Sequence, residues 1–171
     1  MFTTQRQVEF RDTDAAGIVH FSAFFPMMEA AEHAMLRSLG ISVMARPDDS
    51  GHPSGLQSAE SPPHVTWPRV SAHCDYRAAA RFEDILNIAV TVLRLGNSSV
   101  EYGIRFSRSA SADHPEQSDP SSPTLIAEGR LTAVCCTLSP GGKLKKTPIP
   151  EDLRKLLAKH LDSQTFSADQ A

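Results

Sequence analysis

The 171-residue sequence is poor in several features that mark particular classes of protein. Its three cysteines, Cys74, Cys135 and Cys136, are an odd number with two adjacent members, which argues against a disulfide framework. No apolar run approaches the roughly 20 residues that a membrane-spanning helix needs. Lys and Arg number 17 against 20 Asp and Glu, so no basic excess indicates nucleic acid or an anionic membrane as a partner.

The first residues also lack the apolar stretch of a secretory signal. Together with the cysteine pattern, this predicts a cytoplasmic protein. The content of 40% hydrophobic and 22% charged residues is typical of a globular chain, and the length fits one domain. We expect this domain to span residues 1–162 and a flexible tail to occupy residues 163–171.

Two stretches rich in Pro, Ser, Gly and Asp interrupt the chain, at residues 46–63 and 107–123. These residue types form turns and contribute little to a core. Loops of this length are uncommon in compact domains and are usually functional or mobile. We therefore predict two inserted loops at these places.

Between these stretches, periodic apolar residues predict the secondary structure. A long helix is expected at 21–39, with Ser22 as its cap and Gly40 after its end, because apolar side chains recur there every three to four positions. A short helix is expected at 150–161. Strands are expected at 8–11, 64–76, 85–95, 100–106 and 125–138. One apolar helix followed by a meander of strands predicts an α+β fold with an antiparallel sheet around the helix.

The segment DTDAAGIVHF, residues 12–21, lies between the first predicted strand and the long helix. Its small residues and glycine predict a tight turn that leads into a helix start, where backbone N–H groups lack partners. Such N–H groups can hold an oxyanion, and a carboxylate beside them can act as nucleophile or as general base. Alternatively, Asp12 and Asp14 form hydrogen bonds within the turn, as Asp does routinely.

Two motifs resemble those of a known family. VEFRDTDAAGIVHFSAFF, followed by a helix that ends in Leu-Gly, is similar to a motif of the 4-hydroxybenzoyl-CoA thioesterase-like family of hotdog-fold acyl-CoA thioesterases. HCDYRAAARFEDIL, residues 73–86, resembles that family's Y-x-x-P-A-x-x-x-D-x-L segment, with Ala79 where the family often has proline. The resemblance covers roughly residues 5–155. It implies a hotdog fold, in which an antiparallel five- to six-stranded sheet wraps around one long central helix.

The resemblance also implies an activity and a catalytic group. An acyl-CoA thioesterase is expected, which hydrolyses a small aromatic or short-chain acyl-CoA thioester without a metal or a separate cofactor. Asp14 matches the family's catalytic aspartate, as nucleophile or general base, and the backbone N–H of Phe21 matches its oxyanion donor. Gly17 and His20 complete the implied catalytic set. Relatives often have Tyr or His at the Phe21 position, and a phenylalanine side chain cannot transfer protons.

Further residues are implied to bind the substrate. They are Thr13, Ala16, Val19 and Tyr76. Arg94, Lys143 and Lys145 are expected substrate-binding residues as well, because Arg and Lys could hold the phosphates of CoA. The basic hairpin that some relatives use has no basic residue at 95–99 in this chain, so the lysines either replace it or form a solvated loop. Members of the family form homodimers by joining sheets edge to edge, and dimers commonly pair into homotetramers. Active sites lie at the dimer interface.

Three alternatives remain open at this point. A non-catalytic acyl-CoA-binding or scaffold protein of the same fold is compatible with the Phe21 position and the missing basic hairpin. Glu29 or Glu32 on the long helix is a less favoured candidate for a catalytic base than Asp14. A metal site at residues 73–75 is disfavoured, because neighbouring side chains in a strand point to opposite faces.

We also expect residues 50–63 to lie near the mouth of the active site and to influence acyl specificity.

Overall fold

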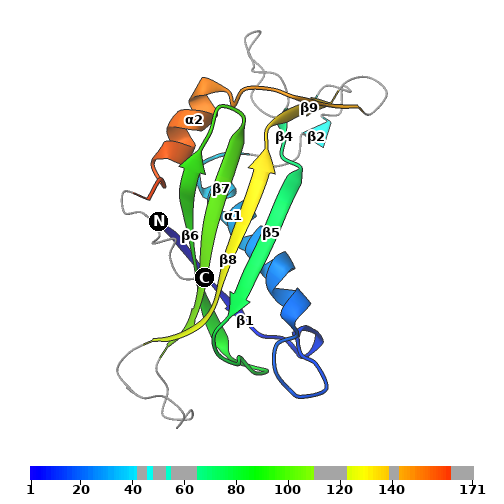
Figure 1. Ribbon diagram of the computed structural model, residues 1–171, viewed down its shortest axis with the longest axis vertical. Helices are drawn as coiled ribbons and strands as arrows, with labels where there is room; N and C mark the ends of the chain where they lie inside the picture. The colour runs from blue at the N-terminus through cyan, green and yellow to red at the C-terminus, as the bar shows by residue number, and fades with distance from the viewer. Residues whose placement is uncertain (42–45, 48–52, 55–64, 110–122, 139–142, 163–171) are drawn as a thin grey trace.

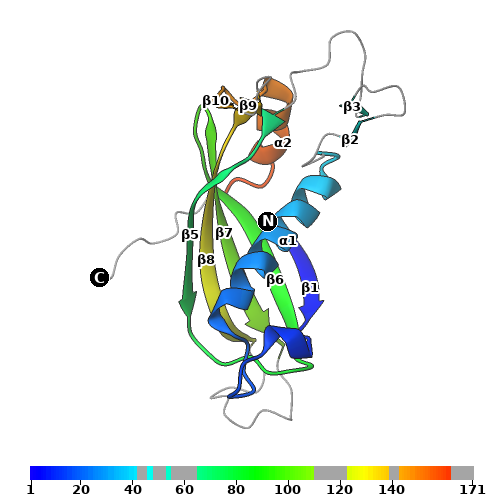
Figure 2. The same cartoon turned by 90° about the vertical axis from the view of Figure 1, so that its right-hand side faces the viewer.

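A computed structural model describes residues 1–41, 46–47, 53–54, 65–109, 123–138 and 143–162. A five-stranded antiparallel sheet forms one layer, and a long helix lies against one of its faces (Figures 1 and 2). This helix, α1 (Phe24–Ser38), follows a short 3-10 helix, η2 (Phe21–Ala23). The strands in their spatial order are β1 (Phe2–Gln7), β6 (Ile85–Leu95), β7 (Ser99–Arg108), β8 (Thr124–Val134) and β5 (Arg69–Tyr76). The predicted α+β fold is confirmed.

Only β6, β7 and β8 form the predicted meander, because β5 precedes them in the chain but lies beyond β8 at the sheet edge. Residues 77–84 make the crossing. At one end the Arg77 and Ala78 N–H groups donate to Ile126 of β8, and at the other the Val8 N–H donates to Asp84 beside β1. The connection is thus bonded to β8 at its start and to the residue after β1 at its end. It runs across the end of the sheet at which β6 begins.

The predicted strand at 8–11 is wrong. Pairing with β6 runs from Phe2 to Gln7, and a 3-10 helix, η1 (Phe10–Asp12), follows it. Residues 8–11 alternate in sequence but do not continue the strand. Phe10, which the alternation places in the core, is 79% exposed. The buried Asp12 accepts a hydrogen bond from the Glu9 N–H. The Asp12 carboxylate therefore stabilises a turn at this point.

Two predicted strands are each divided. The segment at 64–76 splits into β4 (Val65–Thr66) and β5, around Pro68, which has no N–H to donate. The segment at 125–138 splits into β8 and β9 (Cys136–Leu138), because the Cys135 N–H donates to Ser98 in the β6–β7 turn. β4, β9 and β10 (Leu144–Lys146) form a separate small sheet at this end of the molecule.

The insertions are described only in part. The second begins later than predicted, since Ser107 and Arg108 belong to β7. In the first, β2 (Arg46–Pro47) pairs with β3 (Pro53–Ser54). The rest of 46–63, residues 110–122 and the tail at 163–171 lie outside the described residues, and so does the predicted position of residues 50–63 at the site mouth.

The long predicted helix is confirmed over α1, and Gly40 has the expected positive φ of 75° after its end. The predicted cap is wrong: His20, not Ser22, caps η2, because its side chain accepts a hydrogen bond from the Ser22 N–H. The second predicted helix is α2 (Glu151–Ala158), with Pro150 at its N-cap.

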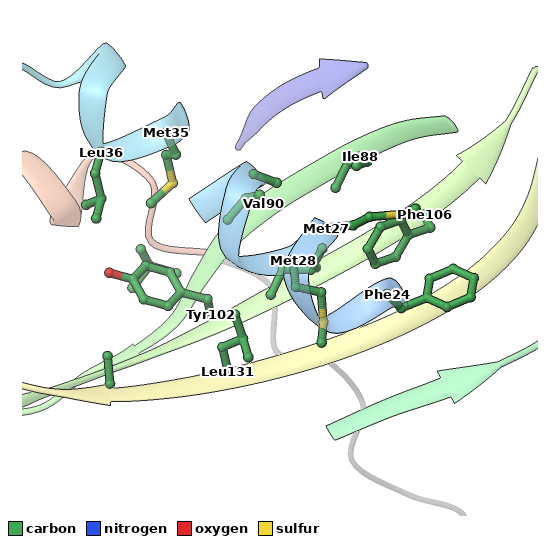
Figure 3. Close-up of a cluster of buried hydrophobic side chains, with 14 of the residues drawn as sticks. Phe24, Met27, Met28, Met35, Leu36, Ile88, Val90, Tyr102, Phe106 and Leu131 are labelled. Atoms are coloured by element: carbon green, nitrogen blue, oxygen red, sulfur yellow. The ribbon is translucent and has the colours of Figure 1, made fainter. Parts of the chain in front are cut away.

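The core lies between α1 and the sheet. Figure 3 shows Phe24, Met27 and Met28 of α1 directed toward the strands, among side chains that include Phe106. The Phe24 and Phe106 rings meet edge to face at 5.2 Å, an arrangement that aromatic pairs prefer. This packing places the start of α1 against the sheet, beside the end of β5.

Candidate active site

The segment that joins η1 to η2 forms a tight loop held by backbone hydrogen bonds. The Asp14 N–H donates to Ile18 at 2.9 Å, and the Gly17 N–H donates to Asp14 at 3.0 Å. Gly17 has φ +74°, a conformation that favours glycine over other residues. The Val19 N–H donates to Ala80 at 2.8 Å, so the loop is tied to the β5–β6 connection.

Asp12 has a structural role in this loop. Arg6 donates to both of its carboxylate oxygens at 3.2 Å, and the Glu9 N–H donates to Oδ2 at 3.0 Å. Its backbone carbonyl accepts from the His20 N–H at 2.8 Å. For Asp12, the alternative of hydrogen bonding within the turn is therefore confirmed.

Asp14 also forms a hydrogen bond within the turn, as that alternative expected, but only through one of its two oxygens. Its Oδ1 accepts from the Ala16 N–H at 2.8 Å, which orients the half-buried carboxylate, and Oδ2 has no hydrogen-bond donor within the described residues. Asp14 lines a cavity of about 390 Å³ at the start of α1. The other lining residues are Ile18, Val19, Phe21, Phe24, Tyr76, Arg77, Ala78, Ala79 and Ala80. A carboxylate oxygen is thus available at a mostly apolar cavity.

Phe21 lies at the first position of η2, where a helical N–H has no partner of its own. No acceptor for the Phe21 N–H is found in the part of the chain that the structure describes. Its carbonyl accepts from the Tyr76 hydroxyl at 3.0 Å, and its side chain is 61% exposed. A free backbone donor and a carboxylate therefore belong to residues that line the same cavity.

His20 caps η2 and does not line the cavity. Its Nδ1 lies 2.7 Å from the Ser22 hydroxyl and accepts from the Ser22 N–H at 3.3 Å, while its ring stacks on Phe21 at 4.3 Å. Gly17 and Ala16 form the exposed side of the Asp14 turn, and the Thr13 hydroxyl donates to the Phe10 carbonyl at 2.8 Å. These residues shape the loop around the cavity.

The structure does not bring the predicted CoA-binding residues to this cavity within one chain. Arg94 is near the end of β6, and Lys143 and Lys145 lie at or next to β10. Figure 2 shows β10 at the end of the molecule opposite the loop that contains Asp14. By contrast, Asp14, Val19, Phe21 and Tyr76 come together as predicted lining residues.

The sequence interpretation missed several lining residues, among them Arg77. Arg77 is the one residue of a cationic type among the described residues that line the cavity. Its guanidinium lies 3.7 Å from Glu128 and 3.9 Å from Asp75. The sequence did contain a signal for these lining residues. Arg77 directly follows Tyr76 in the second motif, and the three residues after it, Ala78–Ala79–Ala80, have side chains too small to fill a cavity.

The carboxylates of α1 lie elsewhere. Glu32 is completely buried and forms an ion pair with Arg69, and burial raises the pKa of its carboxyl group. Glu29 is half exposed, and it too is absent from the cavity lining. Within the described residues, no group of three or more His, Cys, Asp or Glu side chains could hold a metal ion, and no helix is long and apolar enough to cross a membrane.

Comparison with known protein families assigns the chain to one of them. The model of the thioesterase superfamily matches residues 16–112, more than half of the chain. The chain belongs to the thioesterase superfamily. The predicted relationship to 4-hydroxybenzoyl-CoA thioesterase-like proteins is confirmed, and with it the class of thioester hydrolase.

Individual relatives agree with this assignment. The thioesterase is 28% identical over 152 residues to a 1,4-dihydroxy-2-naphthoyl-CoA hydrolase of Synechocystis, covering 88% of this chain and 89% of the relative. The crystal structure of a 1,4-dihydroxy-2-naphthoyl-CoA thioesterase from Synechocystis aligns with a TM-score of 0.68 and 26% identity over 92% and 95% of the two chains. A 4-hydroxybenzoyl-CoA thioesterase variant in complex with 4-hydroxybenzoyl-CoA shares the fold at a TM-score of 0.69 and 18% identity, over 91% and 97%. The predicted hotdog fold is confirmed.

Proposed function

We propose that this thioesterase hydrolyses an acyl-CoA thioester to the free acid and CoA, with Asp14 as its catalytic carboxylate. The observation that carries the proposal is that Asp14 and Phe21 line one cavity, where Asp14 Oδ2 and the Phe21 N–H both lack a partner among the described residues. A thioester carbonyl needs an electrophilic contact at oxygen and a nucleophile at carbon, and these two groups supply both. The reaction written this way requires no cofactor, since CoA is part of the substrate.

The chemistry has two balanced forms. In one, Asp14 Oδ2 attacks the carbonyl carbon, the C–S bond breaks and CoA leaves as the thiolate. Water then hydrolyses the acyl-aspartate anhydride to the free acid and the Asp14 carboxylate, and the proton that is released goes to the thiolate. In the other, Asp14 takes a proton from a water molecule that attacks the carbon directly, the C–S bond breaks, and CoA takes up that proton and leaves as the thiol. In both, the Phe21 N–H donates to the developing oxyanion. Both return Asp14 to its initial state.

The cavity favours an aromatic acyl group. Phe24 and Tyr76 supply aromatic surface, and the alanine run leaves space beside them. Aromatic rings pack well against one another in offset or edge-to-face geometry. The naphthoyl-CoA hydrolases among the relatives support the same choice. We therefore propose a small aromatic acyl-CoA as substrate, with short-chain acyl-CoA as the second class to test.

We further propose that the protein works as a homodimer or homotetramer built on β5. This strand is an edge of the five-stranded sheet, and Val70 on it is 62% exposed. An edge strand with free N–H and C=O groups can pair with a second copy. Antiparallel pairing would set the start of β5 in one copy beside Tyr76 at the end of β5 in the other.

Such pairing supplies a place for the CoA phosphates. Within one chain, β10, which contains Lys145 and directly follows Lys143, lies at the end of the molecule far from the loop between η1 and η2 (Figure 2). In an antiparallel pair of β5 strands, the lysine-bearing end of the second copy would come to the Asp14 end of the first. We propose that these lysines, with Arg94, bind the phosphates across the dimer. The free cysteines agree with the cytoplasm as the proposed location.

The test is free-thiol release from a panel of aromatic and short-chain acyl-CoA thioesters. We expect Asp14→Asn to lower kcat by about 10³-fold, because a positioned acid–base group contributes about 10² to 10⁴. Asp152→Asn, a change to an exposed carboxylate in the first turn of α2, is the control and keeps normal turnover. Normal turnover by Asp14→Asn would remove Asp14 from the mechanism. Tight binding by the unaltered protein without thiol release would favour the non-catalytic alternative.

A further inference from the structure

Tyr76 connects the edge strand β5 to the turn that contains Phe21. It is the last residue of β5, and its hydroxyl donates to the Phe21 carbonyl at 3.0 Å. Its ring lies 5.3 Å from the ring of Phe24, the first residue of α1. Just after it, the Arg77 N–H donates to Ile126 of β8 at 2.8 Å. The position of the Tyr76 hydroxyl is therefore set by the sheet and by the start of α1.

Phe21 needs such an anchor, because its own side chain provides little. That side chain is 61% exposed, and its ring contact is with the adjacent His20. Phe21 also begins a three-residue 3-10 helix, a structure with poorer hydrogen-bond geometry than an α-helix. Core packing thus does not hold this residue, and its orientation depends on hydrogen bonds to the two peptide groups that flank it.

Those two peptide groups are held by different parts of the molecule. The peptide before Phe21 is fixed from within the loop, since the His20 carbonyl accepts from the Ala23 N–H at 2.9 Å. The peptide after Phe21 is fixed by two hydrogen bonds. The Phe21 carbonyl accepts from the Tyr76 hydroxyl, and the Ser22 N–H donates to His20 Nδ1 at 3.3 Å. Within the described residues, Tyr76 is the contact that ties the Phe21 backbone to the sheet.

We propose that Tyr76 is a positioning residue for thioester hydrolysis, whose hydroxyl holds the Phe21–Ser22 peptide to the sheet and so keeps the start of η2, with the neighbouring Phe21 N–H, in place for the developing oxyanion. The inference rests on the proposed function, and it assigns Tyr76 a role different from the substrate contact that the family resemblance implies. Oxyanion donors act through being held in place before the reaction, so a donor on a turn that can shift away from the sheet loses part of its effect. The loss falls on the transition state, where the charge develops, more than on the bound substrate.

The test is Tyr76→Phe, which removes the hydroxyl and keeps the ring against Phe24. We expect kcat to fall about three- to tenfold, the factor that corresponds to one neutral hydrogen bond, while KM changes less than about twofold. The fall is the same for aromatic and short-chain acyl-CoA thioesters, because every thioester develops the same oxyanion. Circular dichroism and the melting temperature check that the variant folds.

Ser38→Ala is the matched control. Its hydroxyl also donates to a backbone carbonyl, that of Met35 at 2.7 Å, but at the opposite end of α1 from the cavity. This variant keeps the normal kcat and KM. Tyr76→Leu, which removes the ring as well, is expected to raise KM in addition to lowering kcat.

Two results would overturn the inference. A rise in KM with unchanged kcat, or an effect confined to one acyl class, would make Tyr76 a substrate contact. An unchanged kcat and KM in Tyr76→Phe would show that the hydroxyl has no part in the reaction. Failure of the proposed function itself looks different, because the unaltered protein would then release no thiol from any thioester of the panel.

Discussion

Gly129 in β8 lies against the Met28 side chain of α1, and it gives a sharp test of the packing. A Cβ atom at this position would lie 2.1 Å from Sδ of Met28 and 3.3 Å from the His73 carbonyl oxygen. Ordinary van der Waals contacts begin near 3.5 Å, so the Met28 sulfur would have to move by about 1.5 Å. Met28 is completely buried, which leaves its flexible side chain little room for that movement.

The expected change in stability follows from two opposing effects. Inserting a methyl group into a packed core costs about 1–3 kcal/mol. Replacing glycine by alanine restricts the unfolded chain, which returns about 0.4–1 kcal/mol. We therefore expect Gly129→Ala to lower the free energy of unfolding by about 1–2 kcal/mol. For a chain of this size, that corresponds to a fall in Tm of about 2–8 °C.

A double-mutant cycle isolates the contact. In a Met28→Ala background, the sulfur is absent and the added methyl group has space, so Gly129→Ala should become neutral or stabilising. Gly103→Ala is the control in the neighbouring strand, since its Cβ would meet the half-buried Leu93 side chain at 3.0–3.1 Å. Urea unfolding of the four variants of the cycle measures the coupling. Equal effects of Gly129→Ala in both backgrounds would refute the contact between α1 and the sheet.

Two further predictions concern charged groups. Burial and Arg69 lower the pKa of His33 below its usual 6.5, so the unfolded chain takes up a proton before the folded protein does, and stability falls as the pH drops from about 6.5. Urea titrations at pH 7.5 and pH 5.5 should therefore show a smaller fall in the free energy of unfolding for His33→Gln than for the unaltered protein. An equal fall in both proteins would contradict His33 as the source of this pH dependence. Asp12→Asn should lower the free energy of unfolding by about 1.5–3 kcal/mol through the loss of a charged acceptor for Arg6, whereas Asp14→Asn should stay within about 0.5 kcal/mol. Equal stability of Asp12→Asn and Asp14→Asn would contradict the division of roles between the two carboxylates.

The elements that the sequence predicted well are those with strong local patterns. α1 combines apolar residues at helical spacing with Gly40 after its end, and β6 and β7 flank a turn at Gly96. Such signals depend on residues close together in the chain. The predicted strand at 8–11 failed because β1 has polar side chains and is held by its backbone pairing with β6, which leaves no local pattern.

The candidate site was predictable where one motif holds it. Asp14 and the Phe21 N–H lie within eight residues of each other, so the loop between them decides their geometry. Tyr76 ends a strand distant in the chain and Arg77 directly follows it, and only the motif pattern pointed to the first of them. Arg94, Lys143 and Lys145 could not be placed from the sequence. The distance of Arg94 from Asp14 depends on the length and direction of β6, and that of the two lysines depends on β8, β9 and β10.

By itself, the sequence determined the family, the central helix and the segment that contains the reactive carboxylate, since each depends on short-range patterns. Only the tertiary structure decided which of the two carboxylates is free. Arg6 occupies Asp12 and leaves Asp14 Oδ2 at the cavity, a choice made by hydrogen bonds between the loop and β1. It likewise decided that Tyr76 meets Phe21, 55 positions away in the chain, because β5 crosses to the sheet edge beside the start of α1.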